Sequence, residues 1–172
     1  MKDNIETLFS KEQINHRVKE LAYSIKKNMT SKEIVLIGLL KGSMMFIADL
    51  AREIDADVRI DFMIVSSYEN ESSSKNVQIN KDLSEDINGK DVVIVEDIVD
   101  SGFTLDKIIS ILKTRDPKSL RVCALLDKIE RREVPVEIDY VGFKVPNEFV
   151  VGYGMDYNQK YRNLPFVGII RG

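Results

Sequence analysis

The chain has few of the residue types and segments that mark several large classes of protein. Its 172 residues include one cysteine, Cys123, and one histidine, His16. One cysteine excludes an internal disulfide and gives no metal-binding spacing, and this lone histidine cannot form a Ser-His triad or a histidine-based metal site. No apolar run approaches the roughly 18 residues of a membrane span, and residues 1–6 are unlike a signal peptide. We therefore expect a cytoplasmic protein with no membrane partner.

A large excess of charge is also missing. The formal net charge at pH 7 is −3, with 31% charged and 44% hydrophobic residues. These fractions are ordinary for a soluble globular protein, and the mild acidity argues against a nucleic-acid partner. Because the chain is short and shows no internal repeat, we expect one domain, residues 1–172, with a sizeable core.

What the sequence does contain is a strand–loop–helix pattern between residues 92 and 104. Val92–Val95 is β-branched throughout, which is typical of a strand buried on both faces of a parallel sheet. The loop Asp100–Thr104 carries one glycine and two hydroxyls, and apolar residues at helical spacing follow it. Gly102 allows a sharp turn, and the backbone N–H groups and dipole of the helix would point at an anion. The pattern therefore favours phosphate binding.

Three carboxylates flank this loop. Glu96 and Asp97 end the strand, and Asp100 opens the loop. Since neighbouring strand residues point to opposite faces, Glu96 and Asp97 cannot both be solvated on one side. An ordinary strand–helix turn with acidic residues is the simpler alternative. Three acids beside a loop that could bind phosphate would instead suit a ligand that has sugar hydroxyls and is bridged by a metal ion.

The rest of the chain predicts an α/β fold with a parallel sheet flanked by helices. Ser10 with Gln13 forms a capping-box pattern at the start of a helix. Ile34–Leu40 and Val58–Val65 read as strands of one right-handed βαβ unit, and Leu120–Leu126 completes a second. The last forty residues predict a small antiparallel hood from short strands at 139–143, 149–153 and 167–170.

The segment Glu96-Asp97-Ile98-Val99-Asp100-Ser101-Gly102-x-Thr104-Leu105 closely resembles the phosphoribosyl-diphosphate (PRPP) motif of type I phosphoribosyltransferases, in particular of their hypoxanthine-guanine branch. Three further segments resemble that branch in the same order: Leu40-Lys41-Gly42, Asp127-Lys128 and residues 149–158. On its own, Lys128 would more often be a surface lysine and Phe149 a core residue. The resemblance covers the chain from Ile34 to Arg171.

The resemblance implies an enzyme of purine salvage. It would transfer the 5-phosphoribosyl group from PRPP to hypoxanthine or guanine, giving IMP or GMP and pyrophosphate, with Mg²⁺ as cofactor. It also implies a homodimer or homotetramer. Its small-molecule partners would be these substrates and products.

The matching positions carry expected roles. PRPP and nucleotide binding falls on Lys41, Gly42, Glu96, Asp97, Asp100, Ser101, Gly102, Phe103, Thr104 and Arg162. Purine binding falls on Lys128, Phe149, Val150 and Asp156, and metal binding on Glu96, Asp97 and Asp156. Asp100 is the candidate catalytic acid/base beside purine N7, and Ser67 and Tyr68 match the branch's lid within the polar loop 66–76. At position 103 the branch often has a lysine or a small residue. Phe103 adds no charge there, so backbone N–H groups and hydroxyls would have to bind the phosphate.

Two alternatives stay open. A PRPP-sensing regulator on the same fold would keep the motif at 96–104 and lose the base pocket. A sibling transferase would act on xanthine or a pyrimidine. Competition among free bases in a PRPP-dependent assay separates these from the main hypothesis.

Overall fold

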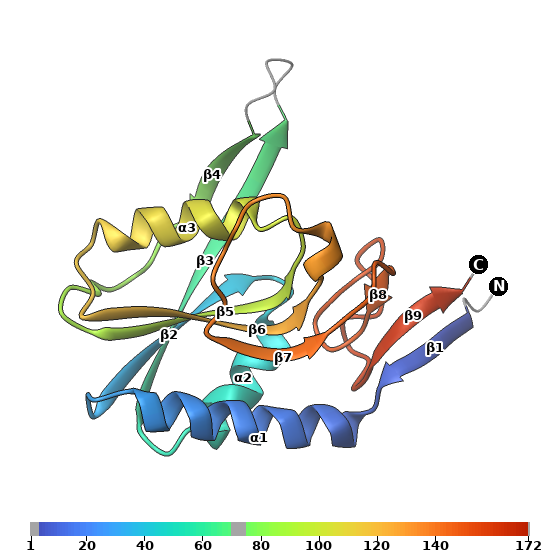
Figure 1. Ribbon diagram of the computed structural model, residues 1–172, viewed down its shortest axis with the longest axis horizontal. Coiled ribbons are helices and arrows are strands. Elements are labelled where there is room, and N and C mark those ends of the chain that lie inside the picture. The colour runs from blue at the N-terminus through green and yellow to red at the C-terminus, as the bar shows by residue number, and fades with distance from the viewer. Residues whose placement is uncertain (1–3, 70–74, 172) are drawn as a thin grey trace.

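The computed structural model describes residues 4–69 and 75–171, and its centre is a six-stranded sheet with the order β4-β3-β2-β5-β6-β7 (Figure 1). The strands are β2 (Glu33–Leu40), β3 (Asp57–Glu69), β4 (Lys75–Lys81), β5 (Asp91–Val99), β6 (Ser119–Asp127) and β7 (Tyr140–Lys144). Neighbours pair in parallel except β3 and β4. The run Val92–Val95 on β5 is fully buried, as the β-branched pattern predicts.

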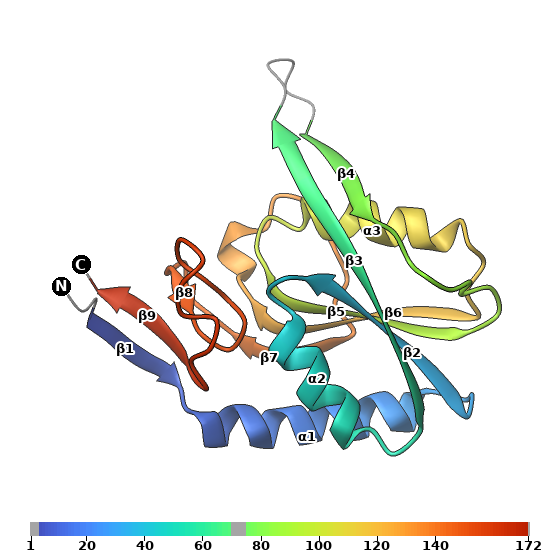
Figure 2. The same cartoon turned by 180° about the vertical axis from the view of Figure 1, so that it is seen from behind.

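Helices cover both faces of this sheet. α1 (Lys11–Asn28) and α2 (Met44–Glu53) lie on one face, and α3 (Phe103–Lys113) lies on the other (Figures 1 and 2). The predicted capping box is formed, because the Ser10 hydroxyl accepts from Gln13 N while Gln13 Oε1 accepts from Ser10 N. Buried apolar side chains form one cluster beneath α1 and α2 and a second beneath α3. Cys123 is fully buried in the first cluster.

The hood contains a second sheet, which is three-stranded and antiparallel. It has the order β1-β9-β8, from β1 (Asn4–Phe9), β9 (Val167–Arg171) and β8 (Val150–Val151). The sequence did not predict β1, whose partner β9 is at the other end of the chain. Figure 1 shows this sheet beside the carboxyl ends of the parallel strands.

The prediction that residues 139–143 belong to the hood is wrong. This segment is β7, which pairs in parallel with β6 at the edge of the main sheet. The crossover between them contains a short 3-10 helix, η1 (Ile129–Arg131), in place of an α-helix. Arg17 of α1 donates from Nε and Nη2 to the carbonyls of Gly142 and Val141, which ties β7 to α1.

The expectation of a loop over residues 66–76 is also too wide. β3 continues to Glu69 and β4 begins at Lys75, so these two paired strands extend beyond the ends of the other strands. Ser67 and Tyr68 pair with Val77 and Asn76 on β4. Residues 70–74 of the predicted lid lie outside the described residues.

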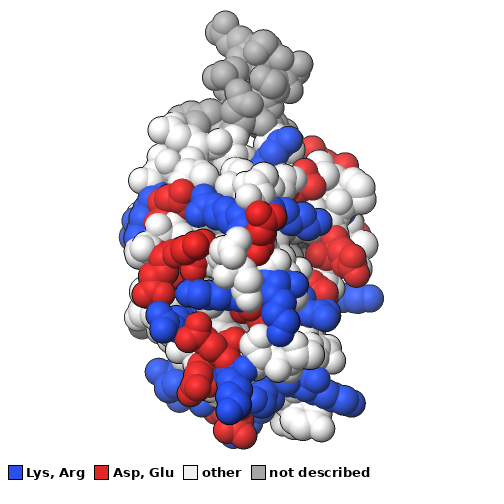
Figure 3. Space-filling view, turned by 90° about the vertical axis from the view of Figure 1, so that its left-hand side faces the viewer, with Lys and Arg blue, Asp and Glu red and all other residues white. Residues whose placement is uncertain are grey.

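Charged side chains of both signs are interspersed on the face at the amino ends of the parallel strands (Figure 3). Several form exposed ion pairs, including Arg59 with Glu33 and Glu85. None of the helices in the described parts of the chain has the length and apolar composition of a membrane span.

Candidate active site

The carboxyl ends of three parallel strands bring the predicted site segments together. Lys41–Ser43 follows β2, Asp100–Gly102 follows β5, and Lys128 follows β6. The segment 149–162 of the hood lies opposite these ends (Figure 1). Ligands of open α/β sheets bind at this edge, so the topology alone marks it as the candidate site.

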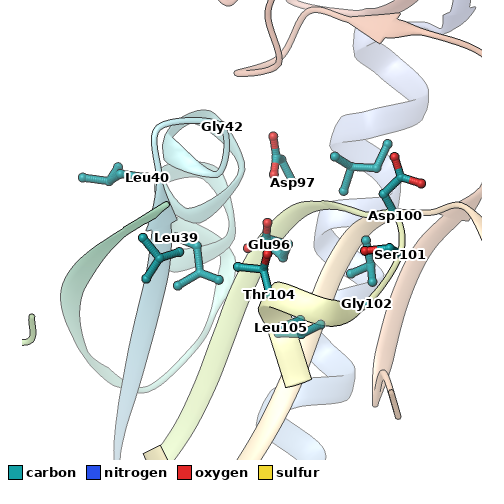
Figure 4. Close-up of a pocket in the computed structure, with 13 residues that line it drawn as sticks. Leu39, Leu40, Gly42, Glu96, Asp97, Asp100, Ser101, Gly102, Thr104 and Leu105 are labelled. Atoms are coloured by element: carbon teal, nitrogen blue, oxygen red, sulfur yellow. The ribbon is translucent and has the colours of Figure 1, made fainter. Parts of the chain in front are cut away.

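The β5–α3 loop lines a cavity of about 240 Å³. Seven of the predicted PRPP-binding residues line it: Gly42, Glu96, Asp97, Asp100, Ser101, Gly102 and Thr104. In Figure 4, Asp97 lies between Gly42 and Asp100, with Glu96 and Thr104 below it. The cavity is therefore ringed by hydroxyls, backbone and carboxylates.

Gly102 makes the sharp turn that the sequence predicts. Its φ of 84° is left-handed, and it is the N-cap of α3. A Cβ at this position would lie 2.8 Å from the Val134 carbonyl oxygen and 2.9 Å from Arg132 Cδ. The backbone therefore leaves no room for a larger residue, and the positive end of the α3 dipole faces the loop.

A second cavity, of about 210 Å³, adjoins the first and shares Asp97, Ile98 and Asp100 with it. Its remaining lining includes all four predicted purine-binding residues: Lys128, Phe149, Val150 and Asp156. Lys128 is only 8% exposed, so the surface-lysine alternative is wrong. Phe149 is 54% exposed and packs edge-on against Tyr157, with 5.5 Å between ring centroids, so it is not a core residue.

Glu96 and Asp97 form a partly buried carboxyl pair. Burial, and next the charge of Asp97, raise the pKa of Glu96 well above its ordinary 4.5. Burial also raises the pKa of Asp97 from 3.8 to about 6, against opposing hydrogen bonds from the N–H groups of Ile98 and Asp97. Within residues 4–69 and 75–171, Glu96 Oε2 has no hydrogen-bond partner.

This pair fits a divalent cation. A cation would offset the repulsion between the two acids and give the buried Glu96 oxygen a partner. Among the described residues, no three Asp, Glu, His or Cys side chains gather closely enough to hold a metal alone. Most of the coordination sphere would therefore come from substrate oxygens and water, which Mg²⁺ accepts readily.

Three segments meet at Gly42. A Cβ on Gly42 would lie 1.8 Å from Asp97 Oδ2, and a Cβ on Gly154 would lie 2.0 Å from the Gly42 carbonyl oxygen. The loop after β2, the acidic end of β5 and the hood are thus in direct contact. The peptide bond between Leu40 and Lys41 is cis.

Arg162 holds the tip of the hood. Its Nη1 donates to the Gly154 carbonyl at 2.7 Å, and its Nη2 lies 2.7 Å from Asp156 Oδ1. Gln159 N donates to the other Asp156 oxygen, and Gln159 Oε1 accepts from Lys41 Nζ at 3.5 Å. Lys41 and Arg162, both predicted to bind PRPP, therefore donate to the same Gln159 oxygen.

Three of the predicted PRPP-binding residues are not among the residues that line the two cavities: Lys41, Phe103 and Arg162. The first and third are placed by the hood contacts above. Phe103 instead lies under Lys107, whose Nζ is 5.6 Å from the ring centroid. The structure therefore adds no role in ligand contact for Phe103.

Two arginines were missed, because the run Glu130–Arg132 looks like a charged loop. Arg131 Nε donates to Asp100 Oδ1 at 3.2 Å. Arg132 is 17% exposed; it pairs with Asp127 at the end of β6 and donates from Nε to the Asp100 carbonyl at 3.1 Å. Arg132 therefore holds the backbone of the Asp100–Thr104 loop in place. Only the abundance of arginine after a strand end could have hinted at this.

Comparisons with known proteins agree with this geometry. Residues 4–158 match the model of the phosphoribosyl transferase domain. The chain is 53% identical to the hypoxanthine phosphoribosyltransferase of Salmonella typhimurium, over 98% of this chain and 96% of the relative. It is 51% identical to the enzyme of that name from Escherichia coli, over the same shares.

Solved structures extend the agreement to three dimensions. A hypoxanthine-guanine phosphoribosyltransferase from Bacillus anthracis superposes with a TM-score of 0.94 at 47% identity. The match covers 99% of this chain and 100% of that one. The parallel sheet, its helices and the separate antiparallel sheet are therefore shared.

Proposed function

The chain belongs to the phosphoribosyl transferase family, and we propose that it transfers the 5-phosphoribosyl group from PRPP to hypoxanthine or guanine, giving IMP or GMP and pyrophosphate in purine salvage. One observation carries this proposal. Two adjoining cavities share Asp97, Ile98 and Asp100; the first is lined by the phosphate-type loop and the second by Lys128 and Phe149. Such a pair suits two substrates that react where the cavities meet.

The residues of the first cavity would bind the phosphoribosyl group. The Ser101–Thr104 loop offers backbone N–H groups and hydroxyls to the 5′-phosphate. Glu96 and Asp97, as acceptor groups, would hold the ribose 2′ and 3′ hydroxyls. Lys41, with the adjoining backbone at Gly42, and Arg162 would receive the pyrophosphate. Mg²⁺ held by Glu96 or Asp97 and by substrate oxygens would neutralise part of the charge on the leaving pyrophosphate.

The residues of the second cavity would position the base. Phe149 stacks on the purine, while Lys128 Nζ and the Val150 backbone N–H donate to the O6 oxygen. Asp156, paired with Arg162, closes the side towards the pyrophosphate. The C1–O bond of PRPP breaks through an oxocarbenium-like ribose, a purine nitrogen bonds to C1, and Asp100 accepts the proton that the purine loses. No covalent intermediate is needed.

Several features beyond the site belong to the same proposal. Ser67 and Tyr68 would belong to a lid that excludes water during the reaction. The chain would act as a single domain, in the cytoplasm, as a homodimer or homotetramer, with small molecules and no nucleic acid as partners. Residues 70–74 of that lid are outside the described parts of the chain.

Base competition tests the proposal. The protein with Mg²⁺ and PRPP is offered equal amounts of hypoxanthine, guanine, xanthine, adenine and a pyrimidine, and the nucleotides formed are quantified. We expect IMP and GMP to dominate. No turnover with any base would indicate a PRPP-binding regulator, and a dominant xanthine or pyrimidine product would indicate a sibling transferase.

A further inference from the structure

Tyr153 in the hood makes a contact that the proposed chemistry does not use. Its side chain is 6% exposed, and its hydroxyl donates to Asp49 Oδ2 of α2 at 2.6 Å. The other Asp49 oxygen is paired with Arg52. Tyr153 has a left-handed φ of 49°, and its N–H donates to the Leu164 carbonyl at 2.8 Å. A strained, buried tyrosine thus joins the hood to α2 across 104 positions of the chain.

Tyr153 directly precedes the hood residue that holds Arg162. Gly154 donates from its N–H to the Arg162 carbonyl at 2.9 Å and accepts from Arg162 Nη1 at 2.7 Å. Gly154 also lies against the Gly42 carbonyl, where no Cβ fits. The position of the Arg162 guanidinium is therefore coupled to the backbone at 153 and 154.

The other end of the contact is equally close to the site. α2 begins after Lys41–Ser43, and Met44 N donates to the Lys41 carbonyl at 3.2 Å while Ile47 N donates to the Ser43 carbonyl at 2.9 Å. Asp49 therefore stands on the helix that continues from the Lys41 loop. The Tyr153–Asp49 bond therefore links the element that follows Lys41 to the segment that contains Arg162.

The phenol remains a donor at all ordinary pH values. Burial, and next the hydrogen bond to the Asp49 carboxylate, raise the pKa of Tyr153 far above its usual range. A bond from a hydroxyl to a carboxylate is also stronger than one between neutral groups, and this one is partly buried. It thus links α2 to the hood, in addition to the contact between Gly154 and Gly42 and the hydrogen bond from Lys41 to Gln159.

We propose that Tyr153 is a positioning residue, which through its bond to Asp49 sets Arg162 opposite Lys41 for the pyrophosphate end of PRPP. The inference rests on the proposed function and assigns to it a residue that touches no substrate. Its consequence is selective: PRPP binding depends on the Tyr153 hydroxyl, and binding of the purine base does not.

The experiment compares Tyr153→Phe with Tyr140→Phe. Tyr140 is an equally buried tyrosine, 5% exposed, on β7 and in the same apolar cluster. We expect Tyr153→Phe to raise KM for PRPP about tenfold, since a hydrogen bond to a charged group is lost, while KM for hypoxanthine stays within about twofold. Tyr140→Phe should leave both KM values unchanged. Asp49→Asn, which keeps an acceptor, should restore most of the PRPP affinity that Asp49→Ala loses.

A double-mutant cycle with Arg162→Ala separates positioning from general stability. If Tyr153 acts through Arg162, adding Tyr153→Phe to Arg162→Ala raises KM for PRPP by less than about twofold. Fully multiplicative effects, or an unchanged KM for PRPP in Tyr153→Phe, would overturn the inference. The dissociation constant of pyrophosphate, measured by calorimetry on the same proteins, tests it without turnover. If the wild-type protein binds pyrophosphate but converts no base, the proposed function is wrong, while the role of Tyr153 in pyrophosphate binding is unaffected.

Discussion

The two sides of the candidate site are built in different ways. The phosphate side is the contiguous segment Glu96–Leu105, which runs from β5 into α3 and is fixed by strand pairing and by Arg132. The hood side, 149–162, has only the two-residue strand β8, and several of its residues have positive φ, among them Tyr153 and Gln159. Its shape depends on distant partners: Asp49 and Gly42. One side is therefore regular strand and helix with a short loop between them, and the other side is irregular backbone held by contacts with distant segments.

This difference has a functional consequence. A change on the phosphate side should affect the chemistry directly, because Asp100 lies where the two cavities meet. A change in the hood should act on substrate affinity through displaced side chains.

The largest effect is expected at Asp100 itself. Asp100→Asn keeps the size and removes the proton acceptor, so kcat should fall about 10²- to 10⁴-fold while the PRPP dissociation constant changes little. Steady-state kinetics and calorimetry measure the two quantities. Asp106→Asn, in the first turn of α3, is the matched control and should turn over normally. Unchanged kcat in Asp100→Asn would remove this residue from the mechanism.

The next largest effect should come from Gly154. A Cβ there would strike the Gly42 carbonyl, so Gly154→Ala should move the hood and lower kcat/KM for PRPP about 100-fold. Gly89 is the control, because it also has a positive φ, 68°, but its Cβ would meet no atom within 4 Å. Gly89→Ala should cost about 1 kcal/mol of unfolding free energy and leave the kinetics unchanged. If Gly154→Ala and Gly89→Ala have the same kinetics, close packing of the hood against Gly42 does not matter for activity.

A smaller and more specific effect is expected at Lys128. Lysine only donates hydrogen bonds, so it suits the O6 acceptor of hypoxanthine and guanine and opposes the amino group of adenine. Lys128→Gln, which can donate and accept, should lower kcat/KM for the oxopurines about 10- to 100-fold and narrow the gap to adenine. Rates with the three bases measure this, with Lys113→Gln as a distant control. Unaltered exclusion of adenine would place the selectivity elsewhere.

The smallest effect concerns stability and pH. Because the folded protein holds a proton on Asp97 up to about pH 6, it binds more protons than the unfolded chain between about pH 4 and 6. The unfolding free energy therefore falls as pH rises through this window, and the raised pKa of Glu96 adds to the fall. Glu96→Gln removes one acid of the pair and should raise Tm of the ligand-free protein by a few °C at pH 8, with little change at pH 4.5.

Thermal melts at both pH values measure this, and the exposed Glu53→Gln serves as the control. A Tm gain that is equal at the two pH values would rule out relief of carboxyl repulsion as its cause. Turnover should fall in Glu96→Gln although Tm rises. The repulsion between the two acids lowers the stability of the folded protein, but both acids are needed to bind the substrate.

Much of the phosphate side could be predicted because its signals are local. The β-branched run Val92–Val95 specifies a buried strand, Gly102 specifies a left-handed turn, and Ser10 with Gln13 specifies a helix start. Each depends on the backbone conformation of a few consecutive residues, which their own side chains decide. Lys128 is different, because its residue type favours the surface and its burial directly after β6 is seen only in the structure.

Other features were decided by the tertiary structure alone. β1 exists because β9 offers it a partner at the opposite end of the chain, and β7 joins the main sheet because the free edge of β6 lies within reach of its crossover. Arg132 and Tyr153 look ordinary in the sequence, since their roles come from Asp127, the Asp100 carbonyl and Asp49. The fold class and the loop that would bind phosphate could be predicted, since nearby residues encode backbone geometry. Which distant groups meet was settled only by folding, because a hydrogen bond or strand pair between remote segments leaves no periodic pattern in either one.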